Sequence, residues 1–450
     1  MSSTTAAPPV NSPARVLLAS LMGTTIEFFD FYIYATAAVL VFPTLFFPQG
    51  DQSAARLASL ATFAVAFVAR PFGSALFGHF GDRIGRKATL VAALLTMGIS
   101  TVVIGLLPSY HSVGLLAPVL LTLCRFGQGI GLGGEWGGAV LMAFEYAPEK
   151  KRGFYASLPQ VGLAIGLCLA SGVVGVLSYA LSDQQFLDWG WRAAFLLSAV
   201  LVFLGTWIRL NVMETPEFAK VKQENAEASI PFIDMIKRYP KNVLAGMGAR
   251  YIDGVFFNVF GVFSLSYLTQ TLNLPRSEAL IGVMVAAVVM CFTIPLFGAL
   301  SDRIGRARVY LWGSLITGIS AFPAFWMMTT SGGDMFTIWL AIVIPFGIFY
   351  ASVYGPEAAL FCELFDAKVR YTGISFVYQF SGIFASGLTP MIATALMRSS
   401  GGQPWSTCWY VLGVGVISAY SAWWIGRYAK KQGKEKEASA GSANPARAMP

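Results

Sequence analysis

Ionisable side chains interrupt several long apolar stretches of this chain, and their spacing pairs some of them. Glu27 and Asp30 are three residues apart, as are Arg250 and Asp253, so each pair shares one face of a helix. A charge at bilayer depth costs at least about 2.5–3.5 kcal/mol and therefore needs a polar cavity or an opposite charge. Such residues are candidates for ligand binding and for carrying a proton, or they form structural ion pairs.

Arginines at bilayer depth are candidates for binding an anion. Arg70 precedes Asp82 by twelve residues, or about 18 Å along a helix, which places it near the middle of a membrane. Because a guanidinium stays charged and forms a planar fork to a carboxylate, we expect Arg70 or Arg125 to anchor an anionic substrate, with Arg250 as a third candidate. For each arginine, the alternative is a structural ion pair with an acidic neighbour.

Membrane-spanning helices are the elements that must hold these residues. The 450 residues are 56% hydrophobic and only 12% charged, and their mean hydropathy of +0.62 lies outside the range of soluble domains. Apolar runs of about 20 residues, the length that crosses a bilayer, alternate with short charged or Pro/Gly stretches. They predict an all-α membrane protein with twelve transmembrane helices, near 16–47, 56–80, 88–107, 113–146, 153–180, 192–211, 242–272, 276–300, 307–329, 335–362, 370–396 and 405–427.

The Lys and Arg residues concentrate in alternate loops, and this bias predicts the orientation. With the N-terminus in the cytoplasm, most basic residues fall on the cytoplasmic side, and the other side receives Arg56, Arg192, Arg276 and Arg398. The positive-inside rule then places both termini in the cytoplasm. Residues 1–13 lack the basic segment and short apolar core of a signal peptide, so we expect none to be removed.

A sequence repeat divides the spans into two halves. The segment Gly78-His-Phe-Gly-Asp82-Arg-Ile-Gly-Arg86 recurs as Gly298-Ala-Leu-Ser-Asp302-Arg-Ile-Gly-Arg306 after the eighth span. We therefore expect two six-helix bundles related by a pseudo-two-fold axis along the membrane normal. The expected divisions are a disordered N-terminus 1–14, bundles 15–211 and 242–427, a cytoplasmic linker 212–241 with a surface helix, and a disordered tail 428–450.

The same repeat bears on which carboxyl group carries a proton. It relates Asp30 to Arg250, so symmetry predicts that these two face one another across a central cavity as a salt bridge or a proton-coupled switch. A carboxyl group removed from water can hold and release a proton. The candidates are Asp30, Glu27, Glu135 and Asp253, and spacing selects none of them.

The repeated loop segment is expected to form a cytoplasmic gate. Asp82 lies at the inner end of the second span, where it can pair with Arg152 or cap a neighbouring helix, and Asp302 repeats the arrangement. Such contacts hold one side closed and separate when the halves rock. Topology alone also requires basic loop residues, but not aspartates. The cytoplasmic gate comprises Asp82, Arg83, Arg86, Glu145, Arg152, Asp302, Arg303, Arg306, Glu363 and Arg370.

Motifs of enzymes and metal proteins are missing or misplaced. Gly129, Gly131 and Gly134 have the spacing of a dinucleotide-binding loop, but they lie within an apolar span, so we interpret them as helix-packing residues. The five cysteines form no CxxC pair and only two histidines are present. We expect neither a metal nor a cofactor, and no enzymatic activity.

Further motifs resemble those of a known family. The segment 78–87 resembles the loop signature of major facilitator transporters, and Arg125-Phe-Gly-Gln128-Gly129 resembles their span-four signature. Other segments are similar to the metabolite:proton symporter branch, which includes shikimate, α-ketoglutarate, citrate and proline/betaine carriers. They are Glu27-Phe-Phe-Asp30, Arg70-Pro71, Gly133-Gly-Glu135-Trp136, Trp189-Gly-Trp-Arg192 and Glu363-Leu-Phe…Val-Arg370, within residues 15–427.

The resemblance implies the major facilitator fold and proton-coupled uptake of a small organic acid, such as shikimate or a keto or dicarboxylic acid, by alternating access in the bacterial inner membrane. Tyr32, Gln160 and Gln379 are expected to supply neutral hydrogen bonds to the substrate. Import of proline or betaine and proton-driven efflux are alternatives, whereas a receptor would need a large output domain. We expect a monomer whose partners are substrate, proton and lipid, without nucleic acid.

Overall fold

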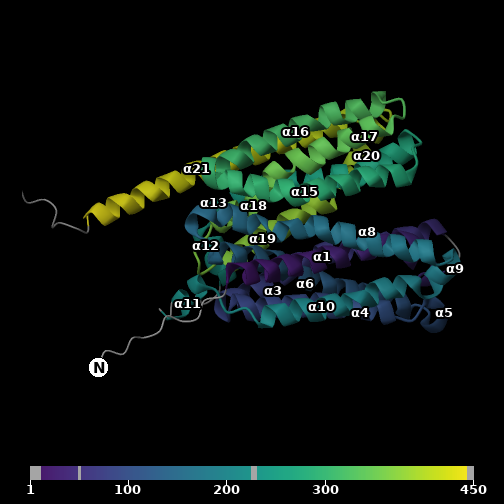
Figure 1. The fold of residues 1–450 in the computed structure, drawn as a ribbon, viewed down its shortest axis with the longest axis horizontal. Helices are drawn as coiled ribbons and strands as arrows, with labels where there is room; N and C mark the ends of the chain where they lie inside the picture. Colours follow the sequence, from purple (N-terminus) through teal and green to yellow (C-terminus); the bar gives the residue numbers. More distant parts are fainter. Residues whose placement is uncertain (1–11, 49–51, 224–230, 443–450) are drawn as a thin grey trace, which may run out of the picture.

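A computed structural model describes residues 12–48, 52–223 and 231–442 (Figure 1). The regular structure in these ranges is helical, without strands. Twelve of the helical segments in this part of the chain are long and apolar enough to cross a membrane. The structure therefore confirms the predicted fold class and number of spans.

The first six spans belong to the N-terminal half. They are α1 (Pro13–Leu40), α3 (Gln52–Arg83), α4 (Arg86–Leu106), α6 (Leu116–Tyr146), α7 with α8 (Arg152–Ser157 and Gly162–Ala180) and α10 (Trp191–Leu210). Short segments join or extend them: α2 (Phe42–Leu45), α5 (Tyr110–Val113), η1 (Glu149–Lys151), η2 (Pro159–Val161), α9 (Asp183–Gln185) and η3 (Phe186–Gly190).

The linker and the C-terminal half follow. The linker contains α11 (Pro216–Gln223) and α12 (Pro231–Arg238). The next spans are α13 (Pro240–Asn258) with η4 (Val259–Phe263), α14 (Ser264–Ser266) and η5 (Tyr267–Thr271), then α15 (Arg276–Ile304) and α16 (Arg306–Thr330). The last are α17 (Met335–Ile342), η6 (Val343–Phe349) and α18 (Ala351–Cys362), then α19 (Arg370–Gly382), η7 (Ile383–Gly387) and α20 (Thr389–Ser399), and finally α21 (Trp405–Ser442).

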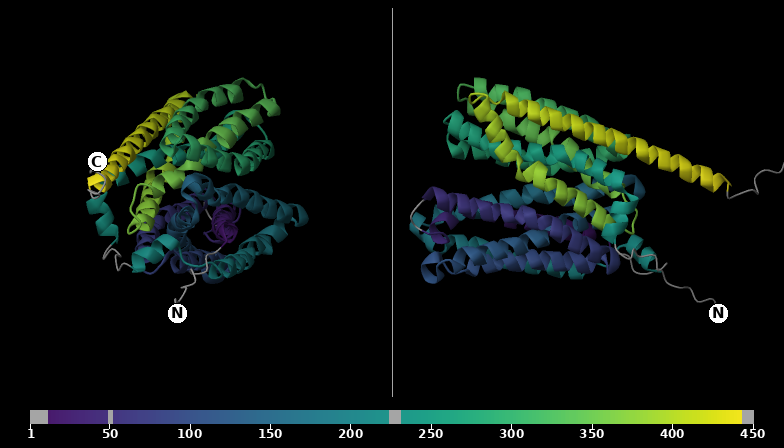
Figure 2. Two further views of the ribbon diagram at one scale, coloured as in Figure 1. Left: turned by 60° about the vertical axis from the view of Figure 1, so that its left-hand side comes forward. Right: turned by 180° about the vertical axis from the view of Figure 1, so that it is seen from behind.

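The two halves form separate bundles that lie side by side along their length (Figures 1 and 2). Contacts between them run mainly from α3 to α19 and from α15 and α18 to α7. Within the N-terminal half, α6 packs against α3 and α4 through glycine: a Cβ on Gly133 would lie 2.2 Å from the Arg70 carbonyl oxygen, and one on Gly131 would lie 2.6 Å from the Met97 amide nitrogen. These glycines therefore permit close helix packing, as the sequence predicts.

Both repeats of the loop segment turn sharply at a glycine. Gly85 between α3 and α4 has φ = 138°, and Gly305 between α15 and α16 has φ = 100°. Residues with a Cβ rarely adopt these values. The Asp-Arg-Ile-Gly-Arg sequence therefore ends one span and starts the next within a few residues in each half.

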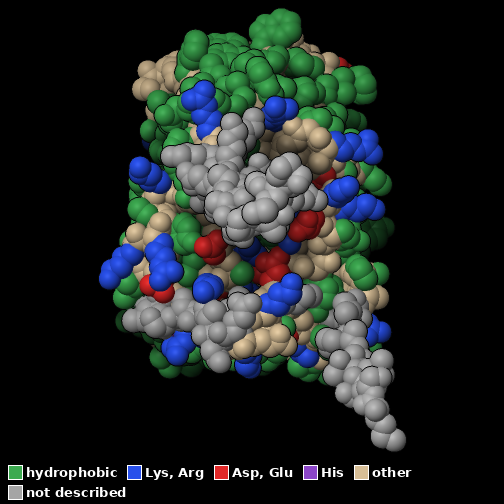
Figure 3. All heavy atoms as spheres, turned by 90° about the vertical axis from the view of Figure 1, so that its left-hand side faces the viewer, with side chains coloured by type: hydrophobic (Ala, Val, Ile, Leu, Met, Phe, Trp, Pro, Cys, Tyr) green, Lys and Arg blue, Asp and Glu red, His purple; other side chains and the backbone are tan. Residues whose placement is uncertain are grey.

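One end of the molecule carries the first residues of α1, the linker helices and the last part of α21, and we call it the linker end (Figures 1 and 2). Lys and Arg side chains are spread over this face, with acidic side chains near its middle (Figure 3). The tail differs from the sequence prediction, because α21 continues as a helix to Ser442 where disorder is expected from residue 428. Its Lys, Glu and Ala residues are strong helix formers, so they extend the last span. The predicted N-terminus and linker lie partly outside the described residues.

Candidate functional site

Asp82 closes the linker end by capping a helix of the opposite half. Its carboxylate accepts hydrogen bonds from the Tyr371 and Thr372 amides at 3.3 and 2.9 Å, and from the Thr372 hydroxyl at 2.8 Å. These amides are at the start of α19, where backbone N–H groups have no partner within the helix. Of the two predicted arrangements for Asp82, capping is the one that the structure contains.

Asp302 makes the symmetric contact in the other direction. Its carboxylate accepts hydrogen bonds from the Gly153 and Phe154 amides, at 2.7 and 2.9 Å, at the start of α7. Each aspartate also pairs with the arginine four residues later: Asp82 with Arg86 at 3.1 Å, and Asp302 with Arg306 at 3.0 Å. Two reciprocal caps therefore join the halves at the linker end.

Glutamates from the predicted cytoplasmic gate continue this network. Glu145 lies 3.6 Å from Arg86 and 3.3 Å from Arg370, whereas Glu363 pairs with Arg306. Arg83 and Arg303, which the sequence also assigns to the gate, are exposed, and neither forms an ion pair with another described residue. The network at the linker end therefore consists of alternating charges, and two of the arginines predicted for the gate take no part in it.

Glu217 of the linker helix α11 adds an asymmetric contact. It pairs with Arg152 at 2.7 Å and also with Arg370, so one carboxylate bridges the first residues of α7 and α19. At the other end of the linker, the Tyr239 hydroxyl donates to Asp366, and burial together with this bond raises the pKa of Tyr239 above its ordinary value. The linker is thus bound to both halves.

Tyr378 lies at the centre of a second group of residues, between the halves and deeper in the protein. Its ring stacks on Trp136 of the other half, with centroids 3.6 Å apart, and the Arg250 guanidinium lies 4.0 Å from the ring centroid. Tyr32 and Arg70 are close enough to Tyr378 to interact with it electrostatically. Both halves therefore contribute polar side chains around one aromatic ring.

The two glutamines bond across the boundary between the halves. Gln160 donates to the Tyr354 carbonyl oxygen, and Gln379 donates to the Leu132 carbonyl oxygen at 3.1 Å. Each amide therefore binds the backbone of the opposite half in this conformation. The Gln160 Oε1 atom is buried without a hydrogen-bond partner.

Arg70 is the arginine of this group that has no paired acid. It is partly exposed, its guanidinium lies over the rings of Phe31 and Phe67, and its Nε atom is buried without a hydrogen-bond partner. Glu27 attracts it electrostatically, although no ion pair joins Arg70 to a carboxylate within the described residues. Arg70 is therefore available to bind an anion between the halves.

Asp30 and Arg125 belong to one hydrogen-bonded chain inside the N-terminal half. Asp30 accepts from the hydroxyls of Thr101 and Ser198, at 2.7 and 2.5 Å. Gln128 donates to the Thr101 oxygen at 2.7 Å and accepts from Arg125 at 3.0 Å. Because all these residues are buried, a proton placed on Asp30 changes a network that reaches Arg125.

Two further buried groups pair an acid with an arginine in each half. Arg209 of α10 donates to both carboxylate oxygens of Glu135. In the other half, Arg250 lies 2.5 Å from Asp253 and 3.8 Å from Glu357. Such buried pairs are stable only when both partners are present.

Comparison with known proteins identifies the family. Residues 16–243 match the family model "Sugar (and other) transporter", and residues 245–448 match "Major Facilitator Superfamily". The chain belongs to the major facilitator superfamily. It is 48% identical to the inner membrane metabolite transport protein YhjE of Escherichia coli K12, over 87% of this chain and 90% of that protein.

Two other relatives support the same family, and a solved structure supports the fold. The shikimate transporter of E. coli K12 is 41% identical over 91% of this chain and 93% of its own length, and the proline/betaine transporter of that strain is 33% identical over 86% and 78%. The fold matches that of the proton:xylose symporter XylE, with a TM-score of 0.74 at 19% identity, over 93% of this chain and 96% of that one. The protein is therefore a metabolite transporter of this superfamily and not an enzyme.

The transporter does not bring all the predicted residues together. Asp30 and Arg250, expected to face one another, are each bonded within their own half. The reason is local: hydroxyls of α4 and α10 satisfy Asp30, and Asp253 on the same helix satisfies Arg250. Residues around Tyr378, by contrast, do gather from both halves.

Sequence reasoning missed the roles of Arg209 and Glu217. Arg209 lies one residue before the end of α10, so it resembles a basic residue of the inner flank, which topology alone explains. Glu217 is one of several charges in the linker, and only the packing of α11 distinguishes it from the others. No signal in the sequence singles out either contact.

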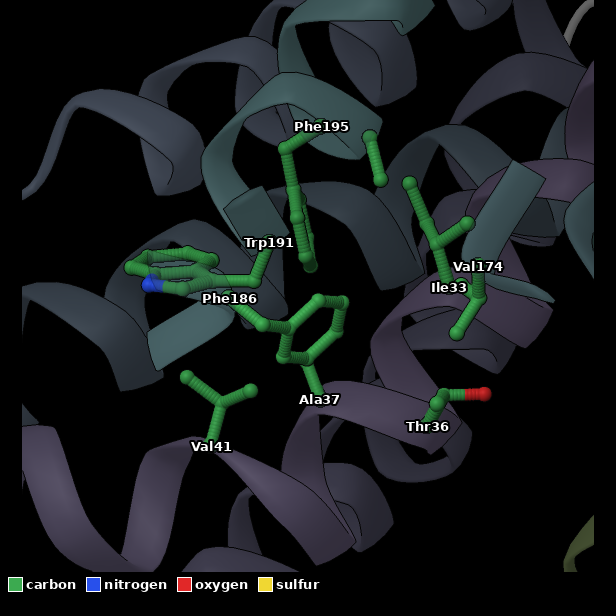
Figure 4. Close-up of a pocket in the computed structure, with 9 residues that line it drawn as sticks. Ile33, Thr36, Ala37, Val41, Val174, Phe186, Trp191 and Phe195 are labelled. Atoms are coloured by element: carbon green, nitrogen blue, oxygen red, sulfur yellow. The ribbon is translucent and has the colours of Figure 1, made fainter. Parts of the chain in front are cut away.

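An apolar hollow of about 250 Å³, part of it open solvent, lies among α1, α8 and α10 in the N-terminal half of the transporter (Figure 4). Its walls are aliphatic and aromatic side chains of α1, α8 and α10, including Ile33, Val174 and Phe195, with Thr36 as the polar residue. Since it has no charged group, it does not suit an organic anion.

Proposed function

We propose that this transporter takes up a small organic acid, such as shikimate or a keto or dicarboxylic acid, together with a proton. Arg70 carries the proposal, because it is an unpaired cation between the halves, next to Tyr378 and near Arg250. A carboxylate is the partner that a planar guanidinium binds best. Among the relatives, one is named for shikimate, and the structural neighbour XylE is named a proton:xylose symporter.

We assign the substrate carboxylate to Arg70, with Arg250 and Arg125 as further cationic candidates. Tyr32, Gln160 and Gln379 are the neutral hydrogen-bonding groups. The unpartnered Tyr32 hydroxyl supports this role now, whereas the two amides become free only after the halves separate.

Asp30 is our first choice for the proton carrier. Its carboxylate is buried, accepts two hydroxyl hydrogen bonds and is electrostatically coupled to Arg125. Protonation would remove its charge and so release Arg125 from that attraction. Glu27 and Asp253 are weaker candidates, and the tight pairing of Glu135 with Arg209 makes Glu135 the weakest of the four.

Alternating access would proceed by opening the cytoplasmic gate. The structure is closed at the linker end by the two aspartate caps, and loss of those contacts would let the bundles rock apart there. We propose that this end and both termini face the cytoplasm, in keeping with its Lys and Arg side chains. A single chain contains the whole pathway between its halves, so we expect a monomer in the inner membrane.

The experiment that tests this function measures uptake in proteoliposomes that contain the purified protein. Radiolabelled shikimate, 2-oxoglutarate, proline and glycine betaine are compared with and without an inside-alkaline pH gradient. We expect accumulation of an organic acid that requires the gradient and is lost in Arg70→Gln. Arg398→Gln, which removes an exposed arginine, is the matched control and should transport normally.

Import of proline or betaine is the second candidate, because one relative is named for these zwitterions. Gradient-dependent accumulation of betaine or proline, with no organic acid taken up, would support it over our proposal. Proton-driven efflux would be indicated if the pH gradient instead drove a loaded compound out of the vesicles.

A further inference from the structure

The buried acidic residues outnumber the arginines that could balance their charge by one. Apart from the cytoplasmic gate, the acidic and basic side chains buried in the described structure are Glu27, Asp30, Arg125, Glu135, Arg209, Arg250, Asp253 and Glu357, and the half-buried Arg70 lies beside them. These are five acids and four arginines. An unbalanced charge in such a place is costly, and the group normally becomes neutral instead.

Each of these four arginines has one acidic residue nearby, although only Arg209 and Arg250 form ion pairs with theirs in the described structure. Glu135 holds Arg209, Asp253 lies 2.5 Å from Arg250, Asp30 interacts with Arg125, and Glu27 interacts with Arg70. The acid left over is Glu357 in α18, which is 3.8 Å from Arg250.

The hydrogen bonds of Glu357 point the same way. The Tyr310 hydroxyl has one proton, and it donates that proton to the Ala249 carbonyl oxygen at 2.9 Å. The same hydroxyl reaches Glu357 Oε2 only at the longer distance of 3.5 Å, so its one proton gives a carboxylate there little stabilisation, and Oε1 has no hydrogen-bond partner. Asp30, Glu135 and Asp253, by contrast, all accept hydrogen bonds from hydroxyl or guanidinium donors.

We propose that Glu357 is protonated in this conformation and is a second proton-carrying site of the transporter, in the C-terminal half. The proposal rests on the proposed proton symport. Three residues before Glu357, the Tyr354 carbonyl oxygen accepts the hydrogen bond from Gln160 of the other half. Separation of the halves at the linker end would break this contact and admit water, so the carboxyl group could release its proton to the cytoplasm.

The charged and titratable groups that face Glu357 come from four helices, and together they set its affinity for a proton. They are Arg250 and Asp253 of α13, Tyr310 of α16, Tyr354 of α18 and Tyr378 of α19. Arg250 is the cation among them, and Asp253 competes with Glu357 for it.

The first test counts protons. In vesicles held at zero membrane potential, each proton carried per substrate supports about tenfold accumulation for one pH unit. We expect about hundredfold accumulation in the wild type and about tenfold in Glu357→Gln, whereas Glu149→Gln, an exposed acid, should match the wild type. Equal accumulation ratios in the wild type and Glu357→Gln would overturn the proposal.

The second test needs no substrate. Infrared spectra of the purified protein at neutral pH should contain a protonated-carboxyl band that disappears in Glu357→Gln and remains in Glu149→Gln. If Glu357→Gln does not fold, Tyr310→Phe keeps the carboxyl group but removes the hydroxyl 3.5 Å from it, so the band should shift. An unchanged spectrum in these variants would refute a protonated Glu357. Failure of gradient-driven uptake in the wild type would instead refute the proposed function. The infrared spectra would still decide whether Glu357 is protonated.

Discussion

At the scale of single residues, Glu135 and Arg209 illustrate how the bundle holds charge away from water. Arg209 donates to both oxygens of Glu135 and, at 3.1 Å, to the Leu90 carbonyl oxygen. Gly23 provides the room, since a Cβ there would lie 2.3 Å from Glu135 Oε1. The pair is satisfied internally, which is why we regard it as structural.

A double-mutant cycle on this pair separates structure from proton transfer. Arg209→Met leaves a buried carboxylate without its partner, a change that costs about 3–5 kcal/mol. We expect a clear fall in the thermal unfolding temperature of detergent-solubilised protein. Adding Glu135→Gln should recover most of that loss and most of the uptake. Stability that recovers without any uptake would instead identify Glu135 as part of the transport chemistry.

Residue patterns predicted the contact within one helix and the equivalence of Asp82 and Asp302, but the repeat wrongly predicted that Asp30 faces Arg250. The spacing of Arg250 and Asp253 placed them on one face, and they do form an ion pair. The sequence allows Asp82 either to cap a helix or to pair with Arg152. Spacing does not decide between the cap and the ion pair, because the outcome depends on how the two bundles pack. Arg152 pairs with Glu217, a linker residue whose position depends on the docking of α11.

At the scale of elements, the aspartate caps couple helix ends to the conformation of the whole protein. Replacing Asp by Asn keeps a capping oxygen but removes the negative charge, whose attraction to a helix N-terminus is worth about 0.3–1 kcal/mol, and the ion pair with the arginine four residues later. Asp82→Asn and Asp302→Asn should each insert normally and slow transport, because the closed linker end is weakened. The measurements are expression level, initial uptake rate and labelling of a cysteine introduced at Thr372. Normal uptake at normal expression in both variants would contradict a gating role.

The linker helix α11 is predicted to stabilise the same closed state. Glu217 is about one-quarter exposed, so its ion pairs contribute at most about 1 kcal/mol. Glu217→Gln should raise the rate of hydrogen exchange at the starts of α7 and α19 by up to about fivefold. Lys220→Gln, which changes an exposed charge on the same helix, is the control. If both variants exchange alike, α11 is only a connection.

At the scale of the whole molecule, the proposed alternating access requires the two bundles to separate at the linker end, where the aspartate caps now join them. Gly137 of α6 and Ser375 of α19 face one another across that boundary: a Cβ on Gly137 would lie 3.1 Å from the Ser375 Cβ. Disulfides need about 3.5–4.5 Å between Cβ atoms, a distance that a small shift of either helix supplies. A cysteine pair at these positions therefore reports on whether the boundary must open.

We expect Gly137→Cys with Ser375→Cys to form a disulfide under oxidation and to lose uptake, with recovery after reduction. The background variant should lack the five native cysteines, of which Cys362 and Cys408 are buried and the others half-buried. The two single variants control for the side chains themselves. If fully cross-linked protein transports as fast as the same protein after reduction of the disulfide, the substrate crosses without separation of α6 and α19. Rocking of rigid bundles would then be excluded as the transport motion.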